Sequence, residues 1–74
     1  MRSSEFRRAV VTEFGEGYGD ALLRDLVIDA LGRRTAEQAL EAGASEREVW
    51  YALCEAMDVP LARRHGAGLP DPRR

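Results

Sequence analysis

The chain has 74 residues, of which 45% are apolar and 32% charged, with a net charge of −2 and one cysteine. Because a chain of this size buries only about 60% of the surface that its unfolded form exposes, we expect one small domain without a deep cleft. No apolar run approaches the roughly 20 residues that cross a bilayer, and the first residues turn polar where a signal peptide turns apolar. Since Cys54 has no second cysteine to pair with, we expect a cytoplasmic protein.

Charge is distributed unevenly along the chain. Residues 1–34 carry equal numbers of acidic and basic groups, whereas residues 35–60 carry six acids against Arg47 alone, a net charge of −5. Residues 61–74 carry four arginines against Asp71, a net charge of +3. An acidic body with a short basic end is not the usual charge pattern of a nucleic-acid-binding protein.

The spacing of apolar residues predicts two helices in the first half of the chain. From about Ser4 to Phe14 the apolar side chains recur at helical spacing, and the glycines of Gly15–Gly17 predict a turn after them. The segment from about Tyr18 to Leu31 is the most apolar, so we expect it to be the central helix, ended by Gly32. Its apolar stripe consists of Leu22, Leu23, Leu26, Val27, Ala30 and Leu31.

Two capping boxes predict where the next two helices begin. In Thr35–Gln38 and in Ser45–Glu48, a hydroxyl and a longer polar side chain three residues later can each bind a free backbone amide. The first of these helices is short because Gly43 ends it, and the second extends through Met57. Together the four segments predict an all-α fold, a small compact bundle of four helices.

One domain is expected, over residues 1–64, in which residues 61–64 could add a further turn. Residues 65–74 combine glycine, proline and arginine with little apolar material, which predicts a flexible basic C-terminal tail.

The last two predicted helices have the spacing of a helix-turn-helix motif. Ala39 falls in the first helix, Gly43 four residues later in the turn, and Val49 six residues beyond it. Such a pair can place its second helix in the major groove of DNA. The outward face of that helix carries three glutamates against Arg47, however, and DNA affinity depends on neutralising several phosphates. A helix-turn-helix-like packing is therefore favoured over DNA binding.

Arginines would make the contacts if DNA were bound. Adjacent arginines on a helix diverge by about 100°, so each pair offers at most one member to a shared surface, and a solvated charged surface is the favoured interpretation. The candidate nucleic-acid contacts are Arg33, Arg34, Arg47, Arg63 and Arg64.

The outward face of the helix that begins at Ser45 is the candidate surface for a protein partner. Tyr51 points away from the apolar face, whereas Trp50 lies at its border, where an indole usually covers the core and donates its N–H to a carbonyl. The predicted contact residues are Arg47, Glu48, Tyr51 and Glu55.

No group of residues predicts catalysis or metal binding. His65, the single histidine, falls in the predicted tail, and one cysteine with one histidine is too few for a zinc site. Asp25 and Asp29 lie on one side of a predicted helix, but carboxylates without a cleft more often pair with arginines. We therefore expect neither an enzyme nor a bound metal or cofactor.

Two motifs form a specific pattern together: Arg-Thr-x-x-x-Ala-Leu-x-x-Gly at residues 34–43 and Val-Trp-x-Ala-x-Cys at residues 49–54. With shorter matches over about residues 1–60, they resemble the actinobacterial domain-of-unknown-function 3046 family. The resemblance implies a small cytoplasmic helical protein and supplies no catalytic residues. It also implies that the gene for this protein lies near the genes for a recombinase and its regulator. Arg7 and Glu13 stand where this family commonly has an aromatic residue and a histidine, so no family role carries over to them.

The sequence thus predicts a non-catalytic protein-interaction or regulatory module with an unidentified protein partner. The alternative is a helix-turn-helix DNA-binding protein linked to recombination or DNA repair. No membrane association is expected, and the chain is a monomer or a homodimer, because so broad an apolar stripe could be covered by a second copy.

Overall fold

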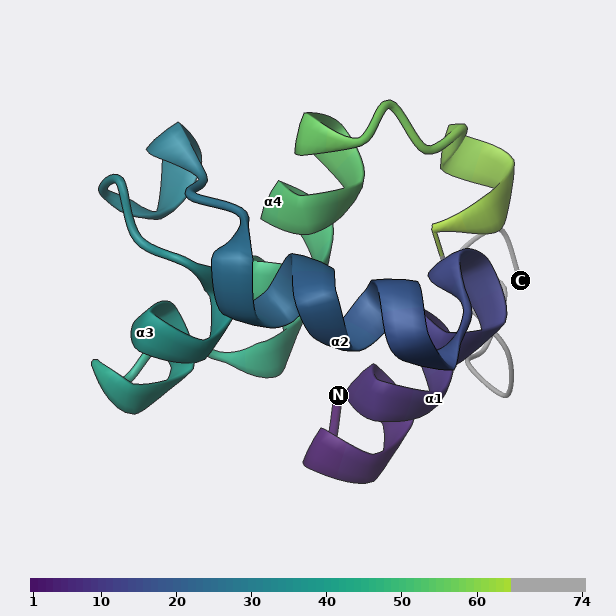
Figure 1. Ribbon diagram of the computed structural model, residues 1–74, viewed down its shortest axis with the longest axis horizontal. Helices are drawn as coiled ribbons and strands as arrows, with labels where there is room; N and C mark the ends of the chain where they lie inside the picture. The colour runs from purple at the N-terminus through teal and green to yellow at the C-terminus, as the bar shows by residue number, and fades with distance from the viewer. Residues whose placement is uncertain (65–74) are drawn as a thin grey trace.

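The computed structural model describes residues 1–64, whose backbone is mostly helical (Figure 1). These residues contain no β-strand, only an isolated bridge between Ile28 and Arg34. The predicted all-α fold with four α-helices is therefore confirmed. In chain order the elements are α1 (Ser3–Phe14), α2 (Glu16–Asp25), the 3₁₀-helix η1 (Asp29–Leu31), α3 (Ala36–Glu41), α4 (Glu46–Ala56) and the 3₁₀-helix η2 (Leu61–Arg63).

The core lies where the four helices meet. α1 and α3 each contact both α2 and α4, so the helices enclose a single apolar centre, and η1 adds a contact with α4. Every α-helix contributes buried side chains, and Ile28 and Val59 come from connections. The buried apolar residues are Phe6, Ala9, Val10, Leu22, Leu23, Ile28, Ala36, Ala39, Val49, Trp50, Leu53, Cys54 and Val59.

The junction between α1 and α2 is shorter than the predicted turn. The backbone turns at Gly15 alone, whose φ of +88° suits a residue without a side chain, and α2 begins at the next residue. Gly17 therefore lies inside a helix instead of in a turn. Gly19 faces α1, where an added Cβ would come within 2.8 Å of Val10 Cγ1, so this glycine lets the two helices pack closely.

The second helix ends six residues before its predicted end. α2 stops at Asp25, and Leu26 takes an extended conformation with φ −78° and ψ 115°. Ile28 then donates its backbone N–H to the Arg34 carbonyl at 2.9 Å, which closes the loop between them. Val27 and Ile28 are β-branched and favour extended backbone. As a result Ile28 enters the core at 3% exposure, while Val27, a member of the predicted stripe, is 57% exposed.

The two predicted helix starts in the second half are confirmed. Thr35 Oγ1 accepts from the Gln38 backbone N–H at 3.2 Å, and Gln38 Oε1 accepts from the Thr35 N–H at 3.0 Å. Ser45 Oγ accepts from the Glu48 N–H at 3.1 Å and caps α4, but the Glu48 side chain does not accept from the Ser45 N–H, so the second predicted capping box is only half formed. Between the helices the chain turns at Gly43, with φ +104°.

Residues 61–64 form the further turn that the sequence allows, now seen as η2. The predicted flexible tail, residues 65–74, lies outside the described residues. None of the helices in residues 1–64 is long and apolar enough to span a membrane.

Candidate functional site

The four predicted protein-contact residues lie together on the outward face of α4. Arg47, Glu48 and Glu55 are exposed, and Tyr51 keeps 40% of its surface accessible. At 100° per residue these positions fall within about 100° of arc. The opposite side of α4 is held in the core by Val49, Trp50, Leu53 and Cys54.

The five candidate DNA-contacting arginines are not gathered on one surface. Arg33 and Arg34 are exposed in the connection between η1 and α3, at one end of the long axis, whereas η2 lies towards the other end (Figure 1). Arg47 is exposed on α4, between these regions in the sequence. Because these five arginines are separated, they form no continuous basic surface among the residues that the structure describes.

Arg63 forms an ion pair that joins η2 to α1. Its Nη2 lies 2.9 Å from Glu13 Oε2, and its Nε also donates to this carboxylate. The Glu13 side chain is only 14% exposed, so the pair lies at the edge of the packed interior.

Arg64 joins η2 to α4 with its backbone and its side chain. Its carbonyl accepts a hydrogen bond from Trp50 Nε1, and its Nε donates to the Val59 carbonyl at 2.8 Å. Its guanidinium also lies 3.5 Å from the Glu55 carboxylate. The prediction that Trp50 packs in the core and donates its N–H to a carbonyl is confirmed. Arg63 and Arg64 thus connect η2 to α1 and α4.

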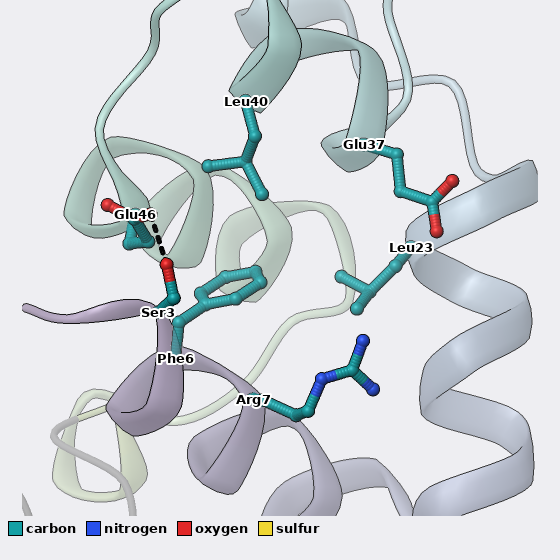
Figure 2. Close-up of a pocket in the computed structure, with 7 residues that line it drawn as sticks. All are labelled: Ser3, Phe6, Arg7, Leu23, Glu37, Leu40 and Glu46. Carbon is teal, nitrogen blue, oxygen red and sulfur yellow. Dashed lines mark hydrogen bonds between the residues drawn. The ribbon is translucent and has the colours of Figure 1, made fainter.

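A pocket of about 150 Å³ opens between the four α-helices (Figure 2). α1 supplies three of its residues, α3 supplies two, and α2 and α4 supply one each. Its walls are largely apolar, and polar groups stand at its rim. The lining residues are Ser3, Phe6, Arg7, Leu23, Glu37, Leu40 and Glu46.

Two polar contacts organise the rim of this pocket. Ser3 Oγ donates to Glu46 Oε2 at 3.0 Å, which ties the start of α1 to the start of α4 (Figure 2). Arg7 Nη1 lies 3.3 Å from Asp20 Oδ1 on α2. The Glu37 carboxylate makes no hydrogen bond or ion pair with any other residue between 1 and 64. Sequence reasoning missed this pocket, because its residues come from four helices and share no spacing.

The remaining candidate reactive groups are the thiol of Cys54 and the carboxylates of Asp25 and Asp29. Cys54 is fully buried, and desolvation raises the pKa of its thiol to about 12, although the nearby Arg64 charge acts in the opposite direction. A thiol protonated at neutral pH is a poor nucleophile. Asp25 ends α2 and pairs with Arg24, while Asp29 begins η1, so the two carboxylates do not share a helix. Residues 1–64 contain no cluster of three or more potential metal ligands.

Comparison with known proteins gives a family and nothing finer. No curated protein and no solved structure matches the chain significantly. The sequence pattern of the family described as "Protein of unknown function (DUF3046)" matches residues 1–62, which is most of the chain. This protein therefore belongs to that family, as its Arg-Thr and Val-Trp motifs predict.

Proposed function

We propose that this protein is a non-catalytic protein-interaction module of the cytoplasm that binds its partner through the outward face of α4. The observation that carries the proposal is Tyr51, an aromatic side chain left 40% exposed on a helix whose other face is fully buried. Tyrosine is enriched among residues that dominate binding energy, because it offers a large, stiff contact surface and a hydroxyl.

The surroundings of Tyr51 favour a basic partner. Glu48 and Glu55 each lie about one turn from it on the same face, and Arg47 is the single base of α4. Glu55 is already paired with Arg64, so Glu48 is the carboxylate of this face that has no cationic partner among residues 1–64. Opposite charge on the partner would raise its rate of association and fix its orientation. Because Trp50 and Leu53 anchor α4 in the core, the helix presents Tyr51 without the entropic cost of ordering a loop.

Affinity capture with matched variants tests this proposal. We expect Tyr51→Ala to weaken partner capture by about thirtyfold, the effect of removing an interface residue worth about 2 kcal/mol. Tyr18→Ala is the matched control, because Tyr18 is an exposed tyrosine on α2. Glu48→Arg should also reduce capture, with Glu16→Arg as its control. Equal loss for Tyr18→Ala and Tyr51→Ala, or no loss for either, contradicts the proposal.

DNA binding through a helix-turn-helix is the second candidate. In its favour, Ala39 and Val49 are buried on either side of the turn at Gly43, as that motif requires. Against it, the outward face of α4 has one arginine among glutamates, and Arg63 and Arg64 are engaged with carboxylates. Duplex DNA retained at about 50 mM salt and released steeply at higher salt would favour this candidate over the first.

A further inference from the structure

We propose that the pocket between α1, α2, α3 and α4 binds a partner-protein segment in which one leucine-sized apolar side chain stands between basic residues. The inference rests on the proposed interaction function only in that its ligand is a protein. Its site is a separate one: Glu46 at the pocket and Tyr51 on α4 project about 140° apart around the helix axis.

The apolar walls set the size and chemistry of the inserted group. Phe6 and Leu23 form the nearly buried part of the pocket, and Leu40 is a more exposed wall. An apolar cavity of about 150 Å³ can hold a group the size of benzene. The pocket has a comparable volume of about 150 Å³, so one branched aliphatic side chain can fill it. Filling it would remove apolar surface from water, which is the main source of affinity at such sites.

The rim selects for positive charge. Glu37 has no cationic partner in residues 1–64, and Glu46 uses only Oε2 to accept from Ser3, which leaves Oε1 available. The positive charge of Arg7 is offset by Asp20 at 3.3 Å. Figure 2 shows Glu37 and Glu46 on opposite sides of the apolar residues. An apolar side chain that enters between them therefore brings its sequence neighbours close to two carboxylates, where arginine or lysine is favoured.

The described part of this chain does not offer such a segment to a second copy. Its three most exposed large apolar side chains are Tyr18, Val27 and Leu61. Tyr18 and Val27 each stand between two acidic residues, two positions away on either side. Leu61 has Arg63 beside it, but that arginine is paired with Glu13. Because none of these three segments within residues 1–64 is complementary to the pocket, we assign the complementary sequence to another protein.

NMR titration of the isotope-labelled full chain tests the proposal. The probe is a short peptide with one leucine between two pairs of arginines. The first control peptide has serine in place of the leucine, and the second has glutamates in place of the arginines. We expect the largest shift changes at Phe6, Leu23 and Leu40, and affinity lower by about tenfold or more for each control peptide. Binding should weaken as salt is raised, because the rim contacts are partly exposed.

Variants of the protein locate the site. Ser3→Trp places a large ring at the exposed rim, and Glu37→Gln removes a charge from an exposed position, so neither disturbs the core. Each variant should lower the affinity for the probe peptide by about tenfold. Glu16→Gln, an exposed glutamate at the start of α2, is the matched control and should leave affinity unchanged.

Several results would overturn the pocket proposal. These are shifts centred on Tyr51, equal binding of the leucine and serine peptides, equal effects of Glu37→Gln and Glu16→Gln, and no binding at millimolar peptide. Self-association that disappears in Ser3→Trp would assign the pocket to a second copy and would also overturn it. The Tyr51→Ala variant should bind the probe peptide normally, so failure at the pocket and failure of the α4 surface are distinguishable.

Discussion

Charged residues serve different purposes around η2 and around the pocket between the four α-helices. Around η2, Arg63 and Arg64 are paired with Glu13 and Glu55, and the Arg64 backbone accepts from Trp50. Around the pocket, Glu37 has no partner among residues 1–64. The comparison teaches that a count of charges does not reveal a binding surface. What matters is which charges the fold has already neutralised.

The largest expected effect is at Trp50, the anchor of the η2 region. Trp50→Ala should lower the free energy of unfolding by about 3–5 kcal/mol, because it removes a fully buried ring that packs edge-on against Phe14. Trp50→Phe should cost less, since it retains one aromatic ring and loses the N–H donated to Arg64 and part of the buried ring volume. Urea denaturation measures both. A loss below about 1 kcal/mol for Trp50→Ala would contradict a structural role for this region.

The buried thiol gives a pH dependence to the same region. Burial raises the pKa of Cys54 from its ordinary value of 9.0 to about 12. In the unfolded chain the thiol ionises first, so its contribution to stability is complete below pH 9 and is lost as pH rises towards 12. Wild type should lose about 1 kcal/mol more per pH unit in this window than Cys54→Ala does. Parallel alkaline unfolding curves for the two proteins would contradict this.

A smaller effect is expected from the ion pair at η2. Arg63→Gln removes the contact with Glu13, which is worth about 1 kcal/mol because the carboxylate is partly buried. Local opening should then expose Cys54 about fivefold more often, measured as the rate of thiol modification under native conditions. Arg33→Gln is the control, because no carboxylate in residues 1–64 lies within 4 Å of Arg33. Equal rates for the two variants would show that the pair does not hold η2.

The local features of this fold could be predicted from the sequence. Thr35 and Ser45 were identified as helix starts because each bonds to an amide only three residues away. Helical spacing placed Trp50 at the border of the apolar face, where its ring covers the core, and the structure buries it fully. These predictions succeed because both partners lie within one helical turn.

The features that were missed depend on contacts between distant segments. α2 ends at Asp25 and Ile28 enters the core. The β-branched pair Val27 and Ile28 was a local signal for extended backbone, but it does not show which of the two residues is buried. The contact between Glu13 and Arg63 spans 50 residues, and no local pattern pairs the two. The pocket residues come from four helices, so only the packed structure brings them together.

Two variants measured by two methods test the central claim most directly. Glu13→Gln and Glu37→Gln remove the same charge from the η2 region and from the pocket rim. We predict that Glu13→Gln lowers the free energy of unfolding by about 1 kcal/mol and leaves the affinity for the arginine–leucine peptide unchanged. Glu37→Gln should keep the free energy of unfolding within about 0.5 kcal/mol of the wild-type value and lower the affinity for the peptide by about tenfold. If both variants change stability and affinity alike, the distinction between structural and binding charges is wrong.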